Sequence, residues 1–141
     1  MQSSLDLWKA EQMAIRIVRL GTPRGAGEGP RLGTVRRPPR GVKKTEYAAR
    51  NFYDAWLPEL APSEELRAAA MSGELTDSRW RKYAARYVRE MSAPAPRHLI
   101  ETLALLSRSV NFSVGCYCED ENRCHRSLLR ELLERAGAKL V

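Results

Sequence analysis

Apolar residues alternate with polar ones, or gather in short runs, in several segments of the chain. Met13 to Leu20 combines β-branched residues with partial alternation and stops at Gly21-Thr-Pro23, which is typical of a strand. Val110 to Cys116 is mostly apolar and predicts a buried strand. Shorter extended segments are expected at residues 32–35, 51–57 and 139–141.

A spacing of three and four residues marks the helices instead. It is clearest between Thr76 and Met91, where one stripe carries Trp80, Tyr83, Ala84, Tyr87, Val88 and Met91. A second helix is expected over about 64–72, because Ser63 can cap its start and Gly73 can end it. Two more are expected at about 96–109 and 124–137.

The order of these elements indicates the fold class. A strand, several helices, a late buried strand and a last helix predict an α/β fold, a single-domain layered structure with a small, mainly parallel sheet flanked by about four helices. We expect this domain to span residues 12–141, preceded by an N-terminal arm at 1–11. A chain of 141 residues with 43% hydrophobic content supports one core.

Several sequence features favour a cytoplasmic protein without membrane contact. The chain contains no apolar run long enough to cross a bilayer, and its first residues lack the pattern of a signal peptide. The three cysteines are an odd number, and Cys116 and Cys118 are too close in an extended segment for a comfortable disulfide. We therefore expect reduced thiols.

Positive charge is concentrated in one segment. The chain has a formal net charge of +7, and residues 16–44 contain nine basic residues but only one acid, Glu28. Glycine and proline are frequent between about 21 and 44, which predicts a flexible basic loop. Such a loop can close over an anionic ligand or follow a phosphate backbone, although a merely solvated loop is the commoner meaning.

Candidate chemistry gathers where the buried strand passes into the last helix. Residues 112–126 contain all three cysteines, Cys116, Cys118 and Cys124, and one of the two histidines, His125. A strand that leads through a loop into a helix N-terminus is where open α/β folds bind ligands, because free N–H groups and the helix dipole point at one place. We therefore expect the functional site here.

Three segments in order resemble a known family. They are Arg40-Gly-Val-Lys-Lys-Thr45, Trp56-Leu-Pro-Glu-Leu-Ala-Pro-Ser63-Glu-Glu-Leu-Arg67, and Cys118-Glu119 followed by Cys124-His125-Arg126. Over about residues 12–141 the chain resembles domain-of-unknown-function family 488, including its YeaO-like branch. The resemblance implies a small cytosolic α/β protein with no established activity.

The first functional hypothesis is an anion site. Arg126 at the helix start and Arg40, Lys43 and Lys44 on the basic loop are the candidate anion-binding residues for a phosphorylated small molecule or nucleotide. His125 is a candidate proton donor, although a buried structural histidine is equally expected at this helical position. Three acids in the connecting loop, Glu119, Asp120 and Glu121, oppose an anion unless they point away.

Two further hypotheses concern the sulfur atoms. Cys118 and His125 are the candidate catalytic residues of thiol chemistry, with Cys118 as nucleophile, but the loop has no glycine to wrap an oxyanion. Cys116, Cys118, Cys124 and His125 also offer zinc ligands, yet their spacing is unusual and adjacent residues 124 and 125 are expected to point apart. We therefore predict no metal, and the cofactor stays unknown.

The alternative function is a non-catalytic nucleic-acid-binding module. It would use the basic 16–44 segment for phosphate contacts, together with the basic face of the 76–91 helix. The sequence does not indicate the oligomeric state. The leading hypothesis remains a ligand site between the 118–126 segment and the 36–44 part of the basic loop.

Overall fold

A computed structural model describes residues 13–141, so the predicted N-terminal arm at 1–11 lies outside the described residues. Four parallel strands form one sheet in the order β1-β4-β2-β3. They are β1 (Ile15–Arg19), β2 (Arg31–Gly33), β3 (Ala55–Trp56) and β4 (Phe112–Cys116). The predicted α/β class with a small parallel sheet is confirmed.

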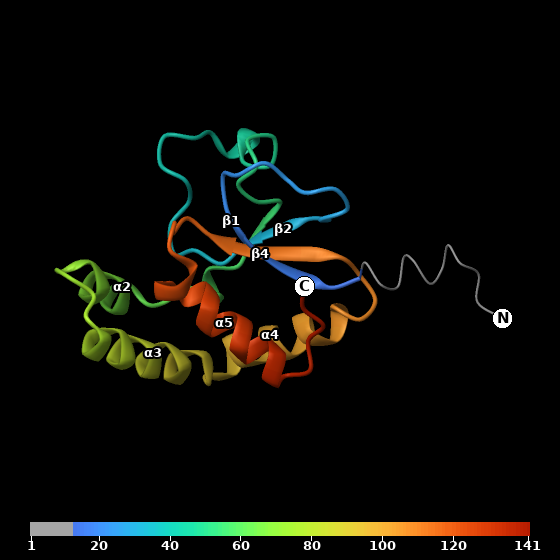
Figure 1. Cartoon of the computed structure of the whole chain (residues 1–141). Coiled ribbons are helices and arrows are strands. Elements are labelled where there is room, and N and C mark those ends of the chain that lie inside the picture. Colours follow the sequence, from blue (N-terminus) through green and yellow to red (C-terminus); the bar gives the residue numbers. More distant parts are fainter. Residues whose placement is uncertain (1–12) are drawn as a thin grey trace.

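Four α-helices accompany the sheet in the described part of the chain. They are α2 (Glu64–Met71), α3 (Asp77–Met91), α4 (Pro94–Leu106) and α5 (His125–Arg135), and short 3₁₀ turns lie at Lys44–Glu46, Pro58–Leu60 and Glu121–Arg123. In Figure 1 the helices gather on one side of the sheet, and the long connections after β1 and β2 lie on the other. No helix within residues 13–141 has both the length and the apolar character needed to cross a membrane.

The helix boundaries follow local signals. The Ser63 hydroxyl accepts a hydrogen bond from the Leu66 N–H at the start of α2, and Thr76 does the same for Arg79 at the start of α3. Pro94 occupies the first position of α4, where its missing N–H costs nothing. The Ser63 hydroxyl and N–H also donate to the carboxylate of Glu90, which ties α2 to α3.

The main core lies between the sheet and the helices. The central strand β4 is buried along its whole length, and Phe112 and Val114 pack with Tyr87 of α3 and Leu129 of α5. The aromatic stripe of α3 is thus core packing, as its period suggests. A smaller cluster beyond the carboxyl end of β4 joins Cys116 and Cys124 to Leu20, Val35 and Tyr53.

Two predicted strands are shorter than expected. The 51–57 segment contributes only Ala55–Trp56, because Asn51 has a positive φ of 64° and the preceding residues form a turn. The 139–141 segment forms a single parallel bridge between Leu140 and Ile15. The sheet therefore extends only a little on either side of its centre: β3 adds two residues beside β2, and Leu140 adds a single bridge beside β1.

Candidate functional site

The structure places the cysteine-rich segment at the carboxyl end of the central strand. Cys116 is the last residue of β4, and His125 is the first residue of α5. The connecting loop contains the 3₁₀ turn Glu121–Arg123, and the carboxylate of Asp120 accepts a hydrogen bond from the Asn122 N–H at its start. The predicted strand, loop and helix arrangement is present.

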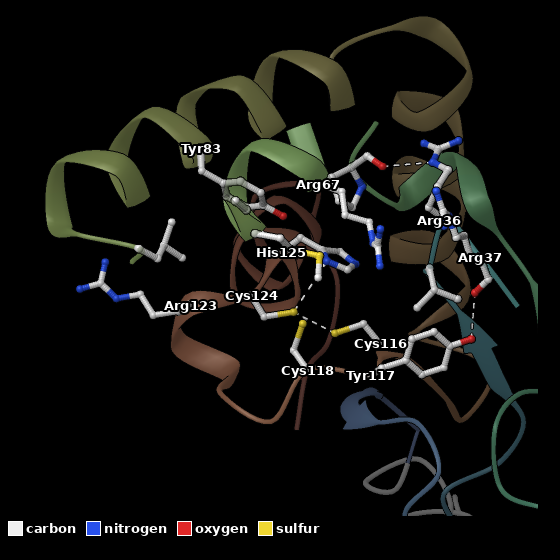
Figure 2. Close-up of a pocket in the computed structure, with 15 residues that line it drawn as sticks. Arg36, Arg37, Arg67, Tyr83, Cys116, Tyr117, Cys118, Arg123, Cys124 and His125 are labelled. Carbon is white, nitrogen blue, oxygen red and sulfur yellow. Dashed lines mark hydrogen bonds between the residues drawn. The ribbon is translucent and has the colours of Figure 1, made fainter. Parts of the chain in front are cut away.

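A pocket opens beside this junction (Figure 2). Its volume is about 410 Å³, and it is bounded by β4 and α5, by α2 and α3, and by the residues that follow β2. The lining residues are Val35, Arg36, Arg37, Pro62, Arg67, Ala70, Met71, Leu75, Tyr83, Cys116, Tyr117, Cys118, Arg123, Cys124 and His125.

The thiols form a compact cluster at the base of the pocket. The sulfurs of Cys116 and Cys124 are 2.8 Å apart and both residues are buried, whereas Cys118 is exposed. Hydrogen bonds from Cys116 and Cys124 lower the pKa of the Cys118 thiol. The bonds to Cys118 and Cys124, followed by burial, raise the pKa of Cys116. Of the three thiols, the exposed Cys118 is therefore the one whose ionisation is favoured.

His125 is a buried, neutral imidazole. Its Nε2 lies 2.7 Å from the backbone oxygen of Thr34, so Nε2 carries the proton and donates it. Burial is the largest influence on the ring and lowers the pKa of His125. The unprotonated Nδ1 lies 3.7 Å from the Cys124 sulfur. Contrary to the sequence expectation, residues 124 and 125 present their donor atoms to one place.

The backbone explains this convergence. Cys124 is extended, with φ −127° and ψ 152°, and the helix begins only at the next residue. The change of conformation between the two neighbours turns both side chains toward the end of β4 (Figure 2).

The predicted anion-binding residues lie elsewhere. Arg126 is only 4% exposed and does not line the pocket; its Nη2 donates to the Cys118 backbone oxygen at 2.6 Å, which holds the loop. Arg40 and Lys43 are exposed outside the pocket, and Lys44 lines a separate depression near Tyr47. None of these four cations is therefore among the residues that line the pocket with the thiols.

Two other arginines of the basic loop do reach the pocket, although both are engaged. Arg36 donates to the backbone oxygens of Ala61 and Pro62, and Arg37 makes a two-pronged contact with Glu64. Both contacts tie the segment after β2 to the start of α2. These arginines form a positively charged wall whose geometry is fixed.

Sequence reasoning missed Arg67 as a site residue. This α2 side chain is half-buried, lines the pocket, and makes no hydrogen bond or ion pair with another described residue. The hydrogen bond from Arg37 lowers the pKa of Glu64, and the charge of Arg67 adds to that effect. In Figure 2 Arg67 extends into the same space as His125. The only sequence signal was its place in the second of the three family segments.

The loop acids do not enter the pocket. Glu119 pairs with Arg19 at 3.4 Å, Asp120 caps the 3₁₀ turn, and neither these two nor Glu121 lines the cavity. Arg123, which does line it, contacts Asp77 and lies over the Trp80 ring, 5.7 Å from its centroid. The carboxylates of the loop therefore do not oppose an anion from within the pocket.

A family model described as the active DUF488-N3 subclade, DUF488-N3a, matches residues 15–137. The chain belongs to the DUF488 family. The match includes every strand and helix of the described fold and all residues of the thiol cluster. No curated protein and no solved structure matches this DUF488 chain significantly.

The pocket thus combines two chemistries within the DUF488 fold. One wall offers guanidinium groups, which bind phosphate or carboxylate oxygens. The base offers three thiols and an unprotonated imidazole nitrogen, which are nucleophiles or ligands of soft metals.

Proposed function

We propose that the pocket binds a phosphorylated small molecule or nucleotide, with Arg67 as its principal anion-binding residue. The observation that carries this proposal is the guanidinium of Arg67 at the wall of the cavity, which forms no hydrogen bond or ion pair within residues 13–141. An arginine that is half-buried without a partner has lost part of its hydration without compensation, so an incoming anion is strongly favoured.

The charge of the lining supports the same ligand class. Four arginines line the cavity, and none of its lining residues is an acid. Arg36 and Arg37 are already bonded to protein groups, but their charge still contributes to the potential inside the pocket. An anion bound to Arg67 therefore enters a positive field.

The remaining lining favours a ligand with a ring or another apolar part. Apolar and aromatic side chains dominate the pocket, among them Val35, Pro62, Met71, Leu75, Tyr83 and Tyr117. A volume of about 410 Å³ lies in the range of small-molecule sites. A nucleotide offers both features, a phosphate for Arg67 and a base for the apolar wall.

Cys118 is the candidate nucleophile if a reaction follows binding. It lines the pocket, it is exposed, and its neighbours lower its pKa. His125 is not assigned a proton-transfer role, because its only proton is donated to Thr34 and its pKa is lowered. Because its pKa is lowered, Cys118 would act as a thiolate without a histidine base to remove its proton.

The test is a thermal-shift and calorimetric titration with phosphate, AMP and a short single-stranded oligonucleotide. A ligand at a hundred times its Kd stabilises the fold by about 2.7 kcal/mol, which is readily measured. We expect AMP to stabilise the wild type, Arg67→Ala to lose the effect, and Arg81→Ala to keep it. Arg81 is a suitable control because it is exposed on α3, outside the pocket, and carries the same charge.

Two results would contradict the proposal. Equal stabilisation of Arg67→Ala and wild type by AMP would show that AMP does not bind through Arg67 in this pocket. Binding of the oligonucleotide alone, fading steeply with salt and lost in an Arg40→Ala, Lys43→Ala double variant, would favour the nucleic-acid-binding module instead.

A further inference from the structure

Three metal-binding donors from two ends of one loop converge at the base of the pocket. Cys116, Cys124 and His125 place two sulfurs and a ring nitrogen within 4.8 Å of one another. These residues are 1%, 2% and 6% exposed, so the cluster is enclosed by protein. Buried thiols commonly act as small apolar residues, but that alone does not account for a nitrogen lone pair aimed at them.

The orientation of His125 is that of a metal ligand with its supporting contact in place. Metal-bound histidines usually donate the proton of the other ring nitrogen to a carbonyl or carboxylate, which fixes the tautomer. Here Nε2 donates to the Thr34 backbone oxygen at 2.7 Å, and Nδ1 faces the Cys124 sulfur at 3.7 Å. The tautomer that leaves Nδ1 free to bind a cation is therefore already selected.

Cys118 completes the donor set. Its thiol lines the same pocket as these three donors, outside the group whose donor atoms lie within 4.8 Å of one another, so a rotation of the Cys118 side chain has to bring it in. The Cys118 backbone oxygen is held by Arg126. A tetrahedral zinc ion with bonds of about 2.0–2.3 Å separates its donor atoms by roughly 3.5–3.8 Å. The observed 3.7 Å between sulfur and nitrogen lies within that range, whereas the 2.8 Å between the two sulfurs is shorter, so binding requires the Cys116 and Cys124 side chains to rotate apart by about 1 Å.

We propose that Cys116, Cys118, Cys124 and His125 bind one zinc ion as a three-cysteine, one-histidine site. Soft thiolates and one imidazole in a tetrahedral arrangement favour zinc among the common divalent ions. The ion clamps the end of β4 to the start of α5, and Cys118 is its exposed ligand. This site does not depend on the proposed anion binding, since Arg67 is not a ligand.

The direct test is metal content and cobalt substitution of the full chain. Protein expressed with added zinc and then desalted is expected to hold one zinc per chain by elemental analysis. After removal of zinc with a chelator, addition of Co²⁺ alone is expected to give the visible bands of tetrahedral cobalt and a thiolate charge-transfer band. No retained zinc and no cobalt bands from a folded chain would overturn the proposal.

Matched variants locate the site. Cys124→Ser and His125→Gln are expected to lose the zinc, whereas His98→Gln, the exposed histidine on α4, is expected to keep it. Because 124 and 125 are buried, their variants are compared only if circular dichroism shows native helix content. Unchanged zinc in either folded variant would overturn the assignment.

The exposed ligand gives a measurement that does not depend on core stability. Cys118→Ser is expected to keep tetrahedral cobalt while losing about one third of the charge-transfer intensity, because two of three thiolates remain. Intensity equal to that of the wild type would exclude Cys118, and a Cys116–Cys124 disulfide in the isolated protein would exclude the site. Arg67→Ala is expected to keep its zinc, which separates this inference from the proposed function.

Discussion

The two ends of the central strands each hold a buried or half-buried arginine, and the two arginines are satisfied very differently. At the amino end, Arg31 is 1% exposed and uses all five of its N–H donors. They go to both carboxylate oxygens of Glu28 and to the backbone oxygens of Thr22, Pro23 and Asn51. Beyond the carboxyl end, Arg67 has no such partner among the described residues.

The difference separates a structural group from one that is available for binding. Glu28 also accepts hydrogen bonds from the Gly25 N–H and the Ser113 hydroxyl, so the amino-end network is closed. A closed buried network gives a unique geometry and leaves no capacity for a ligand. Around the cavity at the carboxyl end lie a cation without a partner among residues 13–141, an exposed thiol and a neutral imidazole.

Breaking the closed network is expected to have the largest effect on stability. Arg31→Ala leaves the carboxylate of Glu28 buried without its partner and removes the Arg31 donors from the backbone oxygens of Thr22 and Pro23. The Asn51 oxygen keeps its bond from the Gly21 N–H. Removal of one member of a buried pair costs about 3–5 kcal/mol. Urea unfolding of the variant and wild type measures this loss.

Arg24→Ala is the matched control. Its ion pair with Asp54 is 2.9 Å long but partly exposed, so we expect a loss of at most about 1 kcal/mol. If Arg31→Ala does not yield folded protein, Arg31→Lys keeps the charge without the five-donor fork and should show an intermediate loss. Losses that are equal for Arg31→Ala and Arg24→Ala would refute the distinction between the two networks.

The second largest effect is expected at the glycine between Glu28 and Arg31. Gly29 has a φ of 78°, and a Cβ there would lie 2.0 Å from the backbone oxygen of Asn111. A Cβ added at Gly27, which has a φ of 69°, would have no atom within 4 Å. Both alanine variants pay about 1–2 kcal/mol for the backbone conformation, and only Gly29→Ala adds a steric cost of about 1–3 kcal/mol.

Thermal or urea unfolding of the two glycine variants isolates the steric part. The difference between them is the quantity of interest, because the backbone strain is common to both. A closed amino end predicts that Gly29→Ala is clearly the less stable variant. Equal stability would mean that the loop before β2 can shift away from Asn111 without loss.

Acid is expected to weaken the amino end more gently than mutation. Burial raises the pKa of Glu28, but the hydrogen bonds from Arg31 and Gly25 outweigh it, and the result lies below the ordinary 4.5. The pKa of Asp54 is lowered from 3.8 as well, by the Arg31 N–H and by Arg24 against the effect of burial. Folded values below the unfolded ones give stability that is present above about pH 4.5 and is lost as the pH falls through the folded values.

The measurement is the urea midpoint between pH 7 and pH 3, in wild type and Glu28→Gln. The wild type should lose stability below about pH 4.5, and the variant should show a smaller acid-dependent loss. Identical slopes in the two proteins would show that other carboxylates dominate the acid response.

How far the sequence predicts these two ends depends on the range of the contacts. The 3.6-residue stripe placed α3 within a residue, and local apolar character placed β4, because both signals lie within one segment. The strand expected at 51–57 has only two residues in the structure, because the Asn51 oxygen accepts hydrogen bonds from the Gly21 N–H and the Arg31 side chain instead of pairing in the sheet. No local pattern reports such long-range bonds.

The candidate pocket lies at the junction where the sequence predicted a site, but its lining residues are only partly the predicted ones. The strand, loop and helix junction at 116–125 follows from the sequence, since neighbouring residues form it. Arg67 lines the pocket from α2, whereas Arg40 lies outside it although Arg36 and Arg37 line it. Both placements depend on tertiary packing. Convergence of Cys124 with His125 depends on one change of backbone conformation that spacing rules do not encode.

The smallest effect on stability is expected for Arg67→Ala, and it tests most directly the difference between Arg67 and Arg31. Arg67→Ala removes a cation that has no hydrogen bond or ion pair in the described part of the chain, so the free energy of unfolding should change by no more than about 0.5 kcal/mol. The same substitution at Arg31 is expected to cost several times more. Urea unfolding without ligand tests the pair, and a large loss in Arg67→Ala would place Arg67 in the scaffold. A small loss of stability combined with abolished AMP binding would show that Arg67 serves ligand binding rather than folding, because Arg67 would then contribute to stability only when an anion is bound.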